Sequence, residues 1–336
     1  TDPSLDEALR GHVAAAGQST PWPVALADQT TDPSLDEALR GHVAAAGRLL
    51  TPVAADLLAT TGRPVDLFGF APNPARLGAA ADATASVEGV ALTQLGALLD
   101  LEHLGYGVAQ AKPLAVLGHS QGVLAVHMTR AIEAAGSIEA AGTTLDEILA
   151  VAALIGAAGT RRVRELGLNP KHGEASPMLS VKGATRVQVE ALVARVNNAR
   201  GPISIAVTNS DNHHVLSGYP EDLAAFALEA EREHQHQAKL REQKLHGGTV
   251  FNPTLEYLEV TLPFHSPLMA DAVEQTVAWA GACGFDQKRT RALAEEVLLN
   301  HVDWNARVKA LFDAADPSKL WIVDLGPGNT LEIGRA

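Results

Sequence analysis

Apolar residues recur at helical spacing along much of the chain. The periodicity predicts one helix over residues 34–61, a second over 87–106 and a third over 123–136, which ends at Gly136. A short apolar run over residues 114–117 predicts a buried strand directly before the third helix. Strands that alternate with helices in this way are typical of an α/β core.

A fourth helix follows, and either Thr143 or Thr144 is predicted to be its N-cap. Its apolar residues, which include Leu145, Ile148 and Ile155, repeat at close to 3.6-residue spacing.

From about residue 175 the pattern changes to short strands and helices. It predicts, in order, a strand in "SPMLSVKG", a helix in "TRVQVEALVARVNN", two strands around an Asp-Asn turn in "ISIAVTNSDNHHVLSGYP", a helix in "EDLAAFALEAEREHQHQAKLREQ" and a strand in "LEYLEVTLPF". This βαββαβ order is that of a ferredoxin-like unit, which we interpret as an insert in the larger core. Further helices are predicted near residues 271–282 and 290–300, and a last strand in "LWIVDLG".

Length and composition narrow the class of protein. With 336 residues, 46% of them hydrophobic, the chain can form one large domain with an insertion, or two domains. The net charge of −13 argues against nucleic acid as a partner, because phosphate binding needs a basic face. The one cysteine, Cys283, fits a reducing cytoplasm. The sequence shows no signal peptide and no apolar run of about 18 residues, so no membrane is expected.

The N-terminal sequence contains a repeat. Residues 1–17 and 31–47 both read TDPSLDEALRGHVAAAG, without one difference. A functional repeat would have drifted, and no third copy follows. The second copy continues into an amphipathic helix, so we interpret residues 1–15 as an artefactual or disordered duplicate.

One short motif suggests chemistry. Residues 118–122 read GHSQG and fit G-x-S-x-G, between the predicted strand and the predicted helix. This pattern suits a sharp turn in which glycines let the backbone crowd and the serine hydroxyl points into a cleft. The N–H groups of the following helix face any charge that forms on a substrate. Ser120 is therefore a candidate nucleophile.

A serine hydroxyl needs a base, and histidine is the usual one. Among 13 histidines, His265 stands out because "LPFHSPLM" follows the last strand of the insert, where the chain re-enters the core. We expect the other histidines near the hairpin and in the charged helix to be exposed, namely His213, His214, His234, His236 and His246. His127, on the helix after the serine, is expected to be structural.

Five motifs, in this order, resemble the acyl-CoA:acyl-carrier-protein transferases: "GHSQG", "VTNSDNHHVLSG", "LPFHSPLM", "NHVDW" and "VDLGPG". The glutamine after the serine and "AGQSTPW" look most like the acetyltransferase domain of bacterial and fungal type I fatty acid synthases. The resemblance runs from about Gly17 to the end of the chain. It implies an α/β-hydrolase-like core with an inserted ferredoxin-like (βαββαβ) subdomain.

The resemblance also implies domain boundaries. The core would occupy residues 16–174 and 263–336, and the ferredoxin-like subdomain residues 175–262. The chain would be a fragment of a multifunctional cytoplasmic enzyme whose other domains are its neighbours, in a large homo-oligomer. The family has a hydrophobic strand before its Gly-Gln pair, and "HVAAAGQ" is a poor one.

Carried over to this chain, the family pattern assigns the chemistry. Ser120 would attack the thioester of acetyl-CoA, and His265 would act as general base and then as acid. The backbone N–H groups of Gln121 and Gln18 would form the oxyanion hole. No cofactor or metal ion would be bound in this domain, and no phosphate loop or metal-ligand spacing is present.

The family orients its histidine with a backbone carbonyl. We expect this carbonyl in the loop near Gly326 or near Asn209. A Ser–His–Asp triad, with Asp324 as the acid, ranks lower. His119 is expected to be structural.

The acyl group would next pass to the phosphopantetheine thiol of an acyl carrier protein. Carrier proteins are usually acidic, so a local basic patch is expected, and Arg161, Arg162 and Arg164 form one candidate. The same three arginines also suit an ordinary solvated helix C-terminus.

The residue at one position, 155, indicates which acyl group the protein would prefer. Malonyl-transferring relatives have an arginine just before a glycine, on a helix that follows the sharp turn of the serine motif. This chain has Ile155-Gly156 at the corresponding position. Isoleucine cannot neutralise a buried carboxylate, so acetyl is favoured. The alternatives are a malonyl or palmitoyl transferase of the same family, a serine thioesterase or hydrolase, and a carrier-protein docking module without activity.

Overall fold

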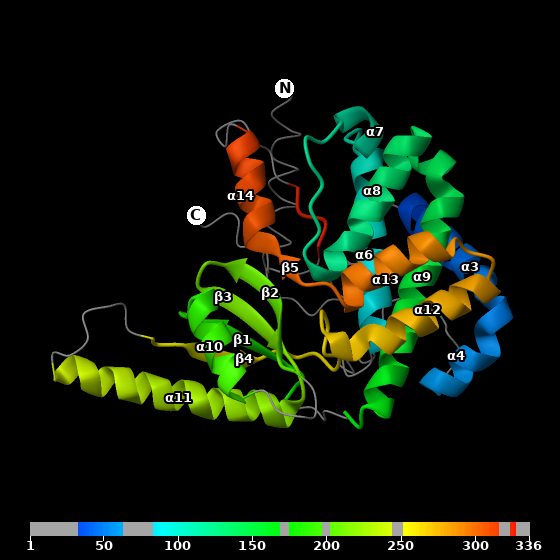
Figure 1. The fold of residues 1–336 in the computed structure, drawn as a ribbon. Helices are drawn as coiled ribbons and strands as arrows, with labels where there is room; N and C mark the ends of the chain where they lie inside the picture. The colour runs from blue at the N-terminus through cyan, green and yellow to red at the C-terminus, as the bar shows by residue number, and fades with distance from the viewer. Residues whose placement is uncertain are drawn as a thin grey trace. The chain divides into compact units, whose positions relative to one another are not determined.

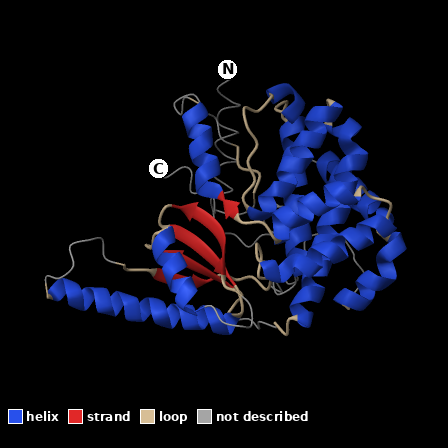
Figure 2. Ribbon diagram, in the orientation of Figure 1, coloured by secondary structure: helices blue, strands red, loops and turns tan. Residues whose placement is uncertain are grey.

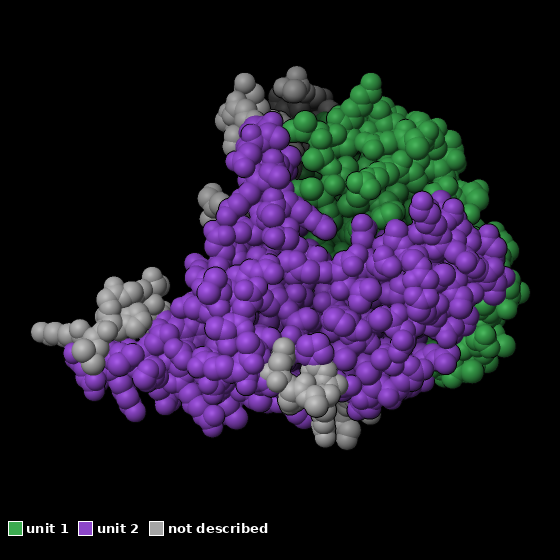
Figure 3. Space-filling model, viewed as in Figure 1, with its two compact units in different colours: residues 1–79, 85–156, 316–336 green, residues 80–84, 157–315 purple. Residues whose placement is uncertain are grey.

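The computed structural model describes residues 33–62, 83–168, 175–196, 202–243, 251–315 and 323–326. The chain forms two compact units, coloured separately in Figure 3: residues 1–79, 85–156 and 316–336 make the first, and residues 80–84 and 157–315 the second. Each is considered by itself. The predicted domain boundaries remain a prediction.

In its described part, the first unit is helical. It contains α3 (Pro33–Leu49), α4 (Ala54–Thr61), α7 (Val108–Ala111), α8 (Val123–Ala135), and most of α6 (Ala83–His103) and of α9 (Ile138–Glu165). The helix predicted over residues 34–61 is interrupted by a 3-10 turn, η1 (Thr51–Val53), and bends by 49°. Pro52 accounts for the break because proline lacks an N–H and its ring clashes with the preceding turn.

The ends of α8 and α9 follow from local capping. Gly136 ends α8 in the left-handed conformation, with φ 84°, as predicted. The N-cap predicted at Thr143 or Thr144 is wrong, because α9 already begins at Ile138. The Ser137 hydroxyl accepts a hydrogen bond from Ala140 N (3.2 Å) and so caps the helix earlier.

The strand predicted over residues 114–117 is not formed. The backbone between α7 and Ser120 contains no strand, and Leu114 is 71% exposed rather than buried. Pro113 has no N–H to donate to a ladder, and no described strand pairs with this segment. In the strand predicted in "LWIVDLG", residues 320–322 lie outside the described residues, and residues 323–326 form no strand.

The strands of the described residues form one sheet in the second unit (Figures 1 and 2). The elements are β1 (Met178–Lys182), α10 (Arg186–Val196), β2 (Ser204–Ser210), β3 (His213–Ser217), α11 (Pro220–Glu242), β4 (Thr254–Tyr257) and, later, β5 (Val302–Asp303). The strand order is β4-β1-β3-β2-β5, antiparallel except for the parallel pair β2–β5. The first six elements therefore come in the predicted βαββαβ order.

Two helices cover one face of this sheet. Apolar residues of β1 and β3 pack with α10 and α11 in a single buried cluster, in which Phe226 and Leu216 are fully buried. Each large side chain buried there contributes about 1.5–3 kcal/mol. The cluster explains why the alternating pattern of this region forms strands, because one face of each strand has a helix to pack against.

The second unit ends in helices. They are α12 (Ala270–Ala282), preceded by the 3-10 turn η4 (Pro267–Met269), then α13 (Gln287–Leu298) and α14 (Trp304–Ala314). The first two long helices were predicted, but β5 and α14 were not. The Asp303 carboxylate accepts a hydrogen bond from Ala306 N (2.9 Å), so the Asp-Trp of "NHVDW" is a helix start that the sequence does signal.

Helix α9 is long and apolar enough to cross a membrane, with 67% of its apolar window buried. That burial is typical of the central helix of a globular core. Among the described residues it is the only unbroken helix of this kind; the bent pair of α3 and α4 also qualifies if counted as one span.

The second copy of the repeat is packed. Its Val43 and Ala46 are buried, and His42 Nδ1 lies 2.6 Å from the Asp146 carboxylate of α9. The first copy lies outside the described residues.

The repeat offers a matched test, because Val13 and Val43 have the same sequence neighbours. We expect Val43→Asp to lower the free energy of unfolding by more than about 3 kcal/mol, since it buries an unpaired charge. Val13→Asp should change it by less than about 0.5 kcal/mol. Urea denaturation of both variants measures this, and equal losses would show that both copies are packed.

Candidate functional site

Ser120 sits in a strained turn at the start of α8. It opens the 3-10 turn η3 (Ser120–Gly122), and its φ of 52° lies in the left-handed region. A Cβ at Gly118 would lie 2.5 Å from Val123 N, so only glycine fits there. A Cβ at Gly122 would meet nothing within 4 Å. The first glycine of the motif is therefore required by backbone crowding and the second is not.

His265 also sits in a strained turn, in the second unit. Its φ is 55° and only 2% of the residue is exposed. The ring Nδ1 lies 2.8 Å from the carbonyl oxygen of Asn300. A carbonyl oxygen only accepts hydrogen bonds, so Nδ1 carries the proton and the neutral ring has its lone pair on Nε2.

Asn300 comes just after α13, which ends at Leu298. The N–H groups of Leu299 and Asn300 both donate to the carbonyl of Glu295, at 2.9 and 2.8 Å. The end of a helix carries partial negative charge on its carbonyl groups, which favours a cation nearby. The contact with Asn300 therefore orients the His265 ring.

The position of this carbonyl corrects one expectation. We expected it near Gly326 or Asn209, and it belongs instead to Asn300, in the "NHVDW" motif. Asn209 Nδ2 lies 3.5 Å from His213 Nε2, and the Asp324 carboxylate accepts from Gly326 N (2.8 Å). Periodicity could not locate the carbonyl, because any residue type supplies one.

The Asn300 contact also bears on the triad alternative. In a Ser–His–Asp triad, the acid accepts from the histidine Nδ1–H. In this chain a backbone carbonyl already accepts from that atom of His265. The position that the acid of such a triad would take at Nδ1 is thus held by the Asn300 carbonyl.

Of the histidines that were expected to be exposed, His236 is exposed, and His213 and His234 are half-buried. His214 was expected to be exposed, but it is fully buried, because β3 is an inner strand of the sheet and this side chain faces the same way as its partner Val181 of the buried cluster. Burial lowers the pKa of His214. His234 Nδ1 donates to the carbonyl of Phe251 (2.7 Å). His246 lies outside the described residues.

The other residues to which the sequence assigned a role lie on several elements, and some lie outside the described residues. Ile155 lies on α9 and is fully buried. Gln121 lies within η3, His119 directly before it and His127 half-buried on α8. Gln18 and the "AGQSTPW" segment lie outside the described residues.

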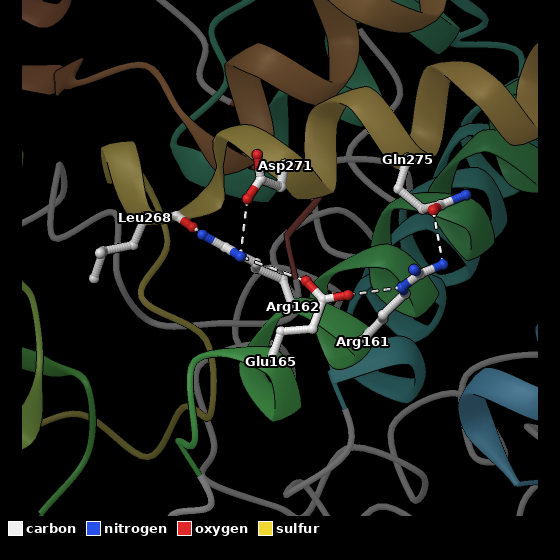
Figure 4. A network of polar contacts seen from close by, with 6 residues as sticks. All are labelled: Arg161, Arg162, Glu165, Leu268, Asp271 and Gln275. Atoms are coloured by element: carbon white, nitrogen blue, oxygen red, sulfur yellow. Dashed lines mark hydrogen bonds and ion pairs between the residues drawn. The ribbon is translucent and has the colours of Figure 1, made fainter.

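Arg161 and Arg162 make contacts within the chain rather than an open basic patch (Figure 4). Arg161 donates to Glu165 (2.9 Å) and to Gln275 (2.8 Å). Arg162 lies 2.8 Å from the Asp271 carboxylate. Arg161 in particular holds the pKa of Glu165 below its usual range. The structure thus favours the helix-end interpretation of these two arginines over a carrier-binding patch.

No group of three or more histidine, cysteine, aspartate or glutamate side chains within the described segments could hold a metal ion. Ser120, in the first unit, and His265, in the second, remain the candidate nucleophile and base that the sequence suggests.

The family comparison matches residues 177–257 to the model "Fatty acid synthase central AT domain". The matched residues run from the start of β1 to the end of β4, which is the whole βαββαβ segment. Residues 177–257 are therefore similar to the central acyltransferase domain of fatty acid synthases.

Two fungal fatty acid synthases are among the proteins that this chain is similar to. It is 30% identical over 163 residues to the "Fatty acid synthase beta subunit TOXC" of Cochliobolus carbonum, a match that covers 44% of the chain and 8% of that protein. It is 29% identical over 168 residues to "Fatty acid synthase 2" of Mycosarcoma maydis, which covers 47% of the chain and 4% of that protein. The chain therefore spans less than a tenth of either relative.

A solved structure with a similar fold is the acyl carrier protein S-malonyltransferase from Vibrio cholerae O1 biovar eltor str. N16961. The TM-score is 0.57 at 14% identity, over 88% of this chain and 83% of the other. At this identity the likeness concerns the fold alone.

Proposed function

We propose that the chain transfers an acyl group from a CoA thioester to the phosphopantetheine thiol of an acyl carrier protein, through an acyl-Ser120 intermediate. The starter group would be acetyl, and the reaction would belong to fatty acid synthesis. The carrier protein and the other domains of a fatty acid synthase, assembled as a large cytoplasmic homo-oligomer, would be its partners. No cofactor is required in this domain.

One observation carries the proposal. Among the described residues, only three that are not glycine have positive φ: Lys112, Ser120 and His265. Lys112 caps the short helix α7. The other two are the nucleophile and base that the sequence suggests. Such backbone conformations cost of order 1–3 kcal/mol each, and they cluster at active sites where the surrounding structure holds them.

The first half-reaction would form the acyl-enzyme. His265 Nε2 takes the proton of the Ser120 hydroxyl as its oxygen attacks the thioester carbonyl. The N–H groups of Gln121 and Gln18 would stabilise the oxyanion, at about 3 kcal/mol for each donor. As the tetrahedral intermediate collapses, the carbon–sulfur bond breaks, and His265 returns the proton to the CoA sulfur.

The second half-reaction would reverse these steps with a new thiol. The phosphopantetheine thiol gives its proton to His265 and attacks the Ser120 ester, and the serine oxygen leaves with the proton back from the ring. Water competes for the same ester, so a transferase needs a site that admits the thiol and limits water.

The finer fold assignment also belongs to this proposal. We infer an α/β-hydrolase-like core that carries the βαββαβ segment as a ferredoxin-like subdomain. The strand order β4-β1-β3-β2, with each neighbour antiparallel, supports the ferredoxin-like part.

Transfer can be separated from hydrolysis in one assay. The purified chain is mixed with radiolabelled acetyl-CoA, with and without free pantetheine. We expect label to leave the enzyme mainly as acetyl-pantetheine, with slow release of acetate. Acetate as the main product in the presence of pantetheine would instead identify a thioesterase, and absence of any enzyme-bound label would leave only a docking module.

The buried apolar surface of Ile155 leads to a specificity prediction. An unpaired malonyl carboxylate costs several kcal/mol, so wild-type protein should load acetyl at least about 100-fold faster than malonyl. Ile155→Arg should raise malonyl loading and depress acetyl loading, because the guanidinium pairs with the carboxylate and is otherwise buried alone.

Competitive loading with the two labelled CoA thioesters measures the preference. Ile155→Met, which nearly conserves volume, should keep the acetyl preference. Circular dichroism establishes that the arginine variant is folded. Equal loading of the two acyl groups by the wild type would overturn the assignment.

A further inference from the structure

Residues 262–268 are called the His265 turn. The C-terminal part of α9 contacts this turn on both sides of the histidine. Before it, Leu262 packs against Gly159 so closely that a Cβ on this glycine would lie 2.8 Å from Leu262 Cδ1. After it, Arg162 Nε donates to the carbonyl oxygen of Leu268 (2.9 Å). Gly159 and Arg162 are three residues apart, so they share one helix face. The two contacts lie three residues before and three residues after His265.

The Arg162 side chain is well fixed for this contact (Figure 4). It is 21% exposed, and its Nη1 lies 2.8 Å from Asp271 and 3.4 Å from Glu165. A guanidinium can hold a carbonyl and two carboxylates at once because its donors lie in one rigid plane, whereas an ammonium is a flexible point charge. The contacts therefore suit arginine and not lysine.

Hydrogen bonds connect the Arg162 contact to the histidine. Leu268, whose carbonyl Arg162 holds, donates its N–H to the Ser266 hydroxyl (3.3 Å). Ser266 in turn donates its own N–H to the carbonyl of Leu298 (3.2 Å). The turn is thus held between α9 and the end of α13, while His265 keeps its strained φ of 55°.

We infer that Arg162 is a positioning residue, which keeps the His265 ring in its reactive orientation by holding the turn that follows it. The inference rests on the proposed function. It gives Arg162 a role inside the domain instead of contact with an acidic carrier protein.

The test compares Arg162→Ala and Arg162→Lys with Arg291→Ala in the full chain. Arg291 is the matched control because it joins two helices of the same unit through Glu274, and its hydrogen bonds and ion pairs go to Glu274 and Glu295 rather than to residues 262–268. We expect both Arg162 variants to lower kcat of acetyl transfer to pantetheine about 10- to 100-fold with KM for acetyl-CoA changed less than about threefold, as is typical of misplaced catalytic groups. Arg291→Ala should keep wild-type kcat.

A second measurement does not depend on activity. Diethyl pyrocarbonate acylates accessible imidazoles, and peptide mapping reports its rate at His265, which is almost fully buried in the wild type. We expect this rate to rise at least about fivefold in the Arg162 variants and to stay unchanged in Arg291→Ala. Rescue of both readouts by lysine would overturn the role, since it would show that charge alone is needed.

The two proposals fail differently. If the wild type transfers no acyl group, the proposed function is wrong. If the wild type transfers acetyl and the folded Arg162 variants keep its kcat and its His265 modification rate, the proposed function stands and the positioning role is wrong.

Discussion

Replacement of Ser120 by alanine is expected to abolish the acyl-enzyme. Only the hydroxyl oxygen is removed, and alanine has no nucleophile to replace it. The fall in kcat should be at least about 10⁴-fold, the scale seen when a nucleophile is removed from a serine enzyme. The fold should be unaffected, because serine and alanine meet the same strain at φ 52°.

Intact-mass spectrometry after incubation with acetyl-CoA measures this directly. The wild type should gain one acetyl group, mapped to the peptide with Ser120, and Ser120→Ala none. Ser137→Ala is the control, since that hydroxyl only caps α9 and its loss should leave the adduct intact. An acetyl adduct of undiminished stoichiometry on Ser120→Ala would place the nucleophile elsewhere.

Ser120→Gly adds a test of the strained turn. Glycine adopts positive φ without penalty, so this variant should be more stable than the wild type by about 1 kcal/mol and equally inactive. Gain of stability with loss of activity is expected where strain is maintained for function.

The turn at Ser120 illustrates which features a sequence can predict. G-x-S-x-G, the apolar helix after it and Gly136 at its end are local signals, and the structure has a tight turn at Ser120 followed by α8. The strand predicted before this turn, over residues 114–117, does not depend on local signals alone. A strand exists only where another strand pairs with it, and four apolar residues after a proline do not specify a partner.

The surroundings of His265 show what a sequence cannot predict. Its place after the sheet segment could be found from the sequence, but the group that orients it could not. The carbonyl of Asn300 belongs to a residue 35 positions away, and its direction is set by the last turn of α13. Every residue has a backbone carbonyl, so residue type does not show which carbonyl accepts the hydrogen bond.

Arginines near a helix end were equally ambiguous in the sequence. The pattern of Arg161 and Arg162 suits both a partner surface and an internal network, and only the positions of Asp271 and Gln275 on α12 distinguish them. His214 was misjudged for a similar reason, because exposure was inferred from the nearby turn rather than from the place of β3 in the sheet.

Replacement of His265 by asparagine should slow acyl transfer by about 10²–10⁴-fold, the usual contribution of a general base. Asparagine is the sharpest choice because it tolerates positive φ better than most residues, and its amide can donate to the carbonyl of Asn300 as the imidazole does. The turn should therefore stay in place while the base is lost.

His234→Asn is the matched control, since His234 Nδ1 also donates to a backbone carbonyl, that of Phe251. Rapid-quench measurement of acetyl-Ser120 formation and of its transfer to pantetheine should show both steps slowed in His265→Asn, because the ring takes and returns a proton in each. His234→Asn should retain both rates within about twofold. If His265→Asn slowed only one of the two steps, the ring would not be the acid and base of the whole cycle, and if it slowed neither, the base would have to be sought among the other histidines.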